Sequence, residues 1–344
     1  MEPVTHALTS LALARAGKKQ LPRFGTAMLI VAGIAPDLDY ASYLGGARAF
    51  LRFDRTVTHS LVSSSALAVA LAGAFYVVAN RRDQRQTETN VSPGPSLRFA
   101  PALIVCAIGI GAHLLLDLAS GVGVQLLWPF RVCWFALDLL REFDLWILIF
   151  LAAGLLLPML TGLVSEEIGE RRNAGRGKGG AIAALALLLV YVGARELLHE
   201  RVVDLLRSRD YHGRAPLAVG AFPSSTSPLE WRGVASTDNT IEEIDVSLAP
   251  GREFDTDRSV TQYKPEDSAA LQAGQQTAAA QLFLKYARFP LASVVRLGDA
   301  YRFELRDERF ERNDGSPANI LVQIEIRDDY RIGSEQFLFA SSGD

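Results

Sequence analysis

Histidine and aspartate side chains recur beside the apolar segments of this 344-residue chain. The clearest pair is His113 and Asp117, which follow the uncharged run FAPALIVCAIGIGA. A spacing of four residues places both side chains on one face of a helix, where both could ligate one ion. Asp37 and Asp39 follow a proline that interrupts their helix, which leaves two carboxylates free to reach a shared centre. Imidazole and carboxylate together suit Zn²⁺, Mn²⁺ or Fe²⁺ better than Ca²⁺.

Two more histidines lie at the ends of apolar segments. His6 lies in the N-terminal apolar run, and His59 opens a later one after FDRTVT. Ionisable side chains at membrane depth are costly unless they are paired or bound to a metal, so their presence indicates a functional site. The predicted metal ligands are His6, Asp37, Asp39, His59, His113 and Asp117. This set is large enough for two ions, although one ion with outer hydrogen-bonding partners fits equally well.

The residues predicted to be catalytic are Asp37, Asp39 and Arg55. A metal ion would lower the pKa of a bound water and polarise the scissile bond, and an aspartate outside its coordination could act as general base. Arg55 or Arg195 could hold an anionic group such as a phosphate. Further candidates for the site are Asp54, Asp144, Arg195 and His199.

Apolar helices must position these side chains. Hydrophobic residues make up 49% of the chain, and they concentrate in its first 200 positions. A short apolar helix is expected at 4–16. Membrane spans are expected at 24–44, 58–79, 100–120, 143–163 and 180–200. The expected fold is a mainly α polytopic bundle of about five or six membrane helices, followed by a soluble α+β domain.

The composition changes after Glu200. The segment AFPSSTSPLEWRGV is rich in proline and serine and predicts a loop in a linker over 201–235. Strands are expected at Thr240–Leu248, Val294–Leu305 and Ile320–Ile326. A helix is expected over Asp267–Arg288, with Asp267 or Ser268 as its cap. The chain is thus divided into a membrane domain at 1–200 that carries the metal site, the linker, and an α+β domain at 236–344.

Basic residues orient the spans. Twelve lie in the loops around 15–23, 81–98 and 171–178, against five in the loops at 45–57 and 121–142. The positive-inside rule therefore places the first set in the cytoplasm, as in a multi-pass protein of the bacterial inner membrane. All the candidate ligands then fall on the non-cytoplasmic side, and the C-terminal domain is expected to be extracytoplasmic. The order of charge and hydrophobicity at the N-terminus is the reverse of that in a cleavable signal peptide.

Each polar group also has a structural explanation. The Asp37–Asp39 pair or His59 could cap a helix, and His113 with Asp117 could form an interhelical hydrogen bond. Arg195 and His199 could extend to the membrane interface. The joint placement of three histidines and three aspartates on one side of the membrane favours a metal site over these separate explanations.

These residues resemble the motifs of YdjM-type inner-membrane proteins, a family described as membrane-bound metal-dependent hydrolases. The matching pieces are Thr5-His6, Pro36-Asp37-Leu38-Asp39, Arg55 with Thr58-His59-Ser60, and His113-Leu-Leu-Leu-Asp117 with Leu127-Trp128-Pro129-Phe130. Downstream, Arg195 to His199 and Phe222-Pro223 with Trp231-Arg232-Gly233 resemble the longer members. The resemblance covers residues 1–235. One position departs from the family pattern, because Asp54 stands where the family commonly has a histidine.

The predicted function is a membrane-bound metal-dependent hydrolase that acts on a lipid or lipid-linked phosphoester at the outer leaflet. Zn is the expected cofactor, with Mn or Fe as alternatives, and the expected partners are membrane lipid and an anionic substrate. A net charge of −3 argues against a nucleic-acid partner. The alternatives are a protein that handles or transports a metal ion, or a non-catalytic membrane scaffold with a structural metal. A transporter needs access from both faces of the membrane. Apart from Arg15 in the short N-terminal helix, no charged residue lies in the cytoplasmic halves of the predicted spans, which argues against a transport path.

Overall fold

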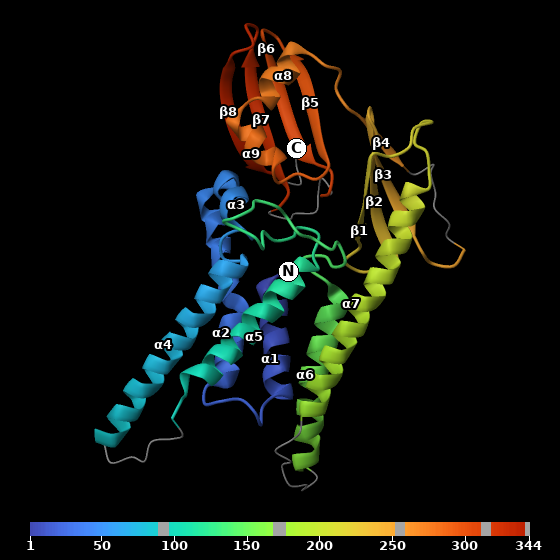
Figure 1. The fold of residues 1–344 in the computed structure, drawn as a ribbon. Helices are drawn as coiled ribbons and strands as arrows, with labels where there is room; N and C mark the ends of the chain where they lie inside the picture. The colour runs from blue at the N-terminus through green and yellow to red at the C-terminus, as the bar shows by residue number, and fades with distance from the viewer. Residues whose placement is uncertain (89–95, 168–176, 252–258, 311–317, 341–344) are drawn as a thin grey trace. The chain divides into compact units, whose positions relative to one another are not determined.

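The computed structural model describes residues 1–88, 96–167, 177–251, 259–310 and 318–340. The chain divides into two compact units that alternate along the sequence (Figure 1). The first unit comprises Met1–Asp39 and Arg55–Arg195, and the second comprises Tyr40–Asp54 and Glu196–Asp344. The short segment Tyr40–Asp54 therefore belongs with the C-terminal residues, although helices of the first unit flank it in the sequence.

Helices build the first unit. They are α1 (Pro3–Ala16), α2 (Gly25–Ile34), α4 (Leu61–Glu88), α5 (Phe99–Leu118), α6 (Leu145–Glu167) and the first part of α7 (Lys178–Arg207). The helix α2 packs against both α1 and α5, α4 packs on α5, and α6 packs on α1. After α2 the chain continues as a 3-10 helix, η1 (Ala35–Gly45). Its tighter turn begins next to Pro36, the residue expected to interrupt the helix.

Three helices of the described residues are long and apolar enough to cross a membrane, namely Leu61–Gln86, Phe99–Leu118 and Lys178–Arg207. They correspond to three of the five expected spans. Of the other two, the 24–44 span is divided into α2 and η1 at Pro36, whereas α6 covers most of the 143–163 span and includes the apolar segment Leu145–Leu160. Three of the expected membrane helices therefore occur among the described residues as long apolar helices, and the number of five or six stays a prediction.

Two antiparallel four-stranded sheets build most of the second unit (Figure 1). The first sheet has the order β1 (Ala218–Pro223), β2 (Glu230–Ser236), β3 (Thr240–Ser247) and β4 (Val260–Tyr263). Its first two strands fall within the stretch expected to be a linker. The small residues in these strands obscure the apolar alternation that indicates a strand. They also leave room for large neighbours. A Cβ on Gly220 would lie 2.8 Å from the Phe289 ring, and one on Gly233 would lie 2.8 Å from Leu206.

The second sheet has the order β5 (Pro290–Leu297), β6 (Ala300–Asp307), β7 (Ile320–Arg327) and β8 (Ile332–Phe339). The single strand expected at Val294–Leu305 is a hairpin that turns at Gly298, whose φ is +63°. The expected helix at Asp267–Arg288 is two short helices, α8 (Ala269–Gln275) and α9 (Ala278–Leu284). Ser268 caps α8, as predicted, and the Thr277 hydroxyl accepts the Ala280 N–H and starts α9.

Candidate metal site

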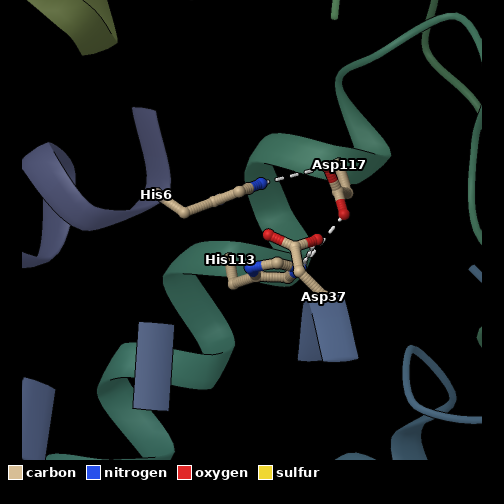
Figure 2. A group of neighbouring side chains, drawn as sticks. All are labelled: His6, Asp37, His113 and Asp117. Carbon is tan, nitrogen blue, oxygen red and sulfur yellow. Dashed lines mark ion pairs between the residues drawn. The ribbon is translucent and has the colours of Figure 1, made fainter. Parts of the chain in front are cut away.

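Three elements of the first unit bring four candidate ligands together. His6 comes from α1, Asp37 from η1, and His113 with Asp117 from α5. One ligand atom from each side chain can be chosen so that all four lie within 4.8 Å of one another (Figure 2). His113 Nε2 lies 3.1 Å from Asp117 Oδ2 and 3.6 Å from Asp37 Oδ1. On the other side of Asp117, Oδ1 lies 3.3 Å from His6 Nε2.

Small residues allow the helices α1, α2 and α5 to approach one another closely. A Cβ on Gly33 of α2 would lie 1.9 Å from the Ser10 hydroxyl of α1. A Cβ on Gly109 of α5 would lie 2.9 Å from both the Ala32 Cβ and the Leu29 carbonyl oxygen of α2. Backbones packed this tightly hold the side chains of α1, α2 and α5 at fixed separations.

Hydrogen bonds leave the imidazoles suited to bind an ion. His113 Nδ1 lies 2.8 Å from the Gly33 carbonyl oxygen, so Nδ1 carries the proton and Nε2 presents its lone pair to the group. The His6 ring stacks on that of His113 with centroids 3.8 Å apart. Burial lowers the pKa of His6 to about 3, so the ring is neutral, as a metal ligand must be.

Some buried polar atoms of the group have no hydrogen-bond partner within the described part of the chain. They are both ring nitrogens of His6 and Asp37 Oδ2. A buried polar atom without a partner is costly, and a cation bound at His6 Nε2 would satisfy one of these ring nitrogens.

His59 and Asp39 lie next to the group of four, not within it. His59 Nε2 lies 2.9 Å from Asp117 Oδ2 and 3.0 Å from His113 Nε2. On its other side, His59 Nδ1 lies 3.0 Å from Asp39 Oδ2, which also accepts the hydroxyl of Thr58 and, at 3.0 Å, the N–H of Arg55. These contacts connect His59 to Asp117 on one side and to Asp39 on the other.

Arg55 is the arginine beside the group. Its guanidinium donates to Ser120 Oγ at 2.9 Å and lies 3.5 Å from Asp117 Oδ1 and 3.7 Å from Glu142 Oε1. The amino group of Met1 also pairs with Asp117. Sequence reasoning did not single out Ser120 or Glu142. Ser120 follows Asp117 at helical spacing, which is a signal that could have identified it, whereas the position of Glu142 depends on the tertiary fold.

The other candidates occupy different places. Asp144 caps α6 by accepting the N–H groups of Trp146 and Ile147, and its second oxygen accepts the Tyr191 hydroxyl at 3.2 Å. Arg195 is fully buried and does not extend to an interface; its Nε donates to the Leu139 carbonyl at 3.0 Å.

Asp54 and His199 belong to the second unit. Asp54 is buried at the end of α3 (Ala47–Phe53), and the His199 ring lies 5.7 Å from that of Trp231.

A comparison with protein families matches residues 1–202 to YdjM inner membrane protein. The match covers α1 to α6, most of α7 and every residue of the group of four. No curated protein and no solved structure matches the chain.

Proposed function

The chain belongs to the YdjM inner membrane protein family, and we propose that it is a membrane-bound hydrolase that uses a divalent metal to cleave a lipid or lipid-linked phosphoester. The observation that carries this proposal is the convergence of His6, Asp37, His113 and Asp117 within 4.8 Å. Groups of this kind at the end of an apolar helix are retained against a large desolvation cost, which favours a functional role.

The donor set fits one divalent ion. Two imidazoles and two carboxylates suit Zn²⁺, which we propose as the natural cofactor, and they also accept Mn²⁺ or Fe²⁺. His59 and Asp39 would then be outer partners, because His59 bridges the Asp39 and Asp117 carboxylates. An outer hydrogen bond of this kind orients a ligand and tunes its basicity. One ion with outer partners is therefore favoured over two ions.

The ion, when bound, would lower the pKa of a water molecule and polarise the phosphoester. The protein's own groups supply the remaining requirements. Asp37 Oδ1 faces His113, and its Oδ2 is buried without a hydrogen-bond partner in the described chain, so Oδ2 could accept a proton while Oδ1 holds the ion. Asp39 instead holds His59, Thr58 and the Arg55 backbone. The Arg55 guanidinium would pair with the anionic oxygens of the substrate.

An exposed apolar side chain next to Asp37 in the chain supports a lipid substrate. Leu38, between the two aspartates of η1, is 71% exposed. Within the group of four, Asp37 has the most accessible side chain, at 15%, so a substrate would approach the group at Asp37. A substrate that presents a phosphate next to a hydrocarbon chain would match this combination of charge and apolar surface.

The basic loops support an extracytoplasmic location for the site and the C-terminal domain. An alkaline phosphatase fused after the last residue is expected to be active, because this reporter works in the periplasm. High activity of a cytoplasm-only reporter at the same position would contradict the orientation.

Metal analysis and hydrolysis assays of the full chain in lipid nanodiscs test the function. We expect about one ion per chain, and metal-dependent release of phosphate from a lipid phosphate or lipid diphosphate in preference to a water-soluble aryl phosphate. Protein that takes up no Zn²⁺, Mn²⁺ or Fe²⁺ would refute the proposal.

A structural metal is the second candidate function. The side chains of His6, His113 and Asp117 are fully buried, as in closed sites that hold a metal without catalysis. This alternative predicts a bound ion whose removal unfolds the helices, and no hydrolysis of any phosphoester in the panel.

A further inference from the structure

The segment Tyr40–Asp54 separates two parts of the candidate site in the sequence. Asp37 and Asp39 precede it, and Arg55 and His59 follow it. The two ends of the segment are tied together, because the Asp39 carboxylate accepts the Arg55 N–H at 3.0 Å. The segment is therefore a closed excursion of the chain, and at its base Arg55 contacts Asp117 directly whereas Asp39 contacts His59.

The body of this excursion packs on the last strand of the C-terminal domain. The Tyr43 ring stacks on the Phe339 ring of β8 with centroids 4.6 Å apart, and the Phe50 ring of α3 meets Phe339 edge-on at 5.8 Å. The Arg48 guanidinium lies 5.8 Å from the centroid of the Phe337 ring. Aromatic and cation–π contacts of this kind add to the free energy of apolar burial and have preferred geometries.

From these contacts we propose that the C-terminal domain positions the candidate metal site through Tyr40–Asp54, with Phe339 as the main positioning residue. Phe339 holds Tyr43 and Phe50, and these hold the excursion whose base is the Asp39–Arg55 hydrogen bond. Asp39 in turn contacts His59, which contacts Asp117. Arg55 has a φ of +52°, a left-handed conformation that a non-glycine residue keeps only when its surroundings impose it.

This inference gives the C-terminal domain a role in the site itself. A domain that only recruited partners would have no need to hold the chain between Asp39 and Arg55. The metal readout of the test rests on the proposed function, whereas the hydrogen-exchange readout does not.

The test replaces Phe339 with Ala in the full chain and follows exchange of the Arg55 amide hydrogen by mass spectrometry. Loss of the aromatic contacts loosens the excursion, so we expect this amide to exchange about two- to tenfold faster. The affinity for Zn²⁺ alone, measured by competition with a chelator, is expected to fall by a similar factor. Phe339→Tyr keeps the ring and should retain wild-type behaviour in both measurements.

Tyr301→Ala is the matched control. It also removes a stacked aromatic ring from the second sheet, but the partner of Tyr301 is Tyr330 of the sheet itself, with centroids 6.0 Å apart. It should leave both measurements unchanged. A chemical cross-link provides a second check. In a variant whose native Cys106 and Cys133 are replaced, the substitutions Tyr43→Cys and Phe339→Cys remove the aromatic contact. Joining the two new cysteines with a short bismaleimide should restore slow exchange of the Arg55 amide.

The proposal is overturned if Phe339→Ala leaves Arg55 exchange at the wild-type rate, or changes it no more than Tyr301→Ala does. It is also overturned if cross-linking does not restore slow exchange. A wild-type chain that binds no Zn²⁺ would instead refute the metal site, and Arg55 exchange would still decide whether β8 positions the excursion.

Discussion

Replacing Asp117 with Asn distinguishes a metal ligand from an interhelical hydrogen bond. Asp117 is fully buried, with Oδ2 2.9 Å from His59 Nε2 and 3.1 Å from His113 Nε2, while Oδ1 lies 3.3 Å from His6 Nε2. Asparagine has nearly the same size and keeps one acceptor oxygen at this position. It removes the negative charge and one of the two oxygens, which are the properties that an ion requires.

The two explanations predict effects of different size. An interhelical hydrogen bond in a membrane bundle contributes about 0.6 kcal/mol on average, so weakening it would change an equilibrium by no more than about threefold. Loss of an outer partner of a metal ligand typically costs about 10- to 100-fold in affinity, and loss of the ligand itself costs more. At about 1.4 kcal/mol for each factor of ten, a hundredfold loss corresponds to about 3 kcal/mol.

The assay measures the Zn²⁺ dissociation constant of the full chain by chelator competition and checks helix content by circular dichroism. Asp144→Asn is the matched control, since Asp144 is another buried aspartate of the same unit but caps α6. Asparagine is an equally good helix cap, so the control should keep the metal. An Asp117→Asn protein with wild-type affinity and activity would show that the pair serves packing alone.

Three further predictions concern packing, substrate binding and pH. Gly33→Ala should destabilise the first unit by about 1–3 kcal/mol in thermal unfolding, because its Cβ would meet Ser10 Oγ at 1.9 Å; Ser10→Gly in the same chain should restore part of the loss. Arg55→Lys should raise KM for a phosphoester more than it lowers kcat while metal content stays constant, because a lysine cannot form a bidentate contact; an unchanged KM would contradict the assigned role. Burial, together with the neighbouring Glu243, raises the pKa of Glu308 to about 7, so the folded C-terminal domain binds a proton that the unfolded chain releases near pH 4.5. Its contribution to stability is present below pH 4.5 and is lost as the pH rises to about 7, by at most about 3 kcal/mol. Glu308→Gln should flatten this decline in urea unfolding followed by Trp231 fluorescence, and an equally steep decline in the variant would contradict the assignment.

Local features of the sequence were enough to identify the segments that carry the group of four. A four-residue spacing on a helix places His113 and Asp117 on the same face. A proline inside a helix, such as Pro36, interrupts the helix. The helices α4, α5 and α7 were predictable for the same reason, because length and apolar composition are properties of a single segment. Ser268 was recognisable as a helix cap because a cap bonds to a backbone group three residues away.

Only the tertiary structure decided which polar residues share a site. The sequence grouped Asp39 and His59 with the other predicted ligands and named Asp144 as a further candidate. Three-dimensional packing places Asp39 and His59 next to the group of four, with His59 Nε2 3.0 Å from His113 Nε2, and Asp144 at the start of α6. It also turned Arg195 toward the Leu139 carbonyl and Arg55 toward Asp117.

The same holds for the fold. Gly220 of β1 and Gly233 of β2 leave room for Phe289 and Leu206, and in Tyr40–Asp54 the Tyr43 ring stacks on Phe339. These partners are separated in the sequence by between 27 and 296 residues. Contacts over such distances leave no periodic pattern in either segment. They form only when folding brings the two segments together, so a local sequence pattern does not predict them.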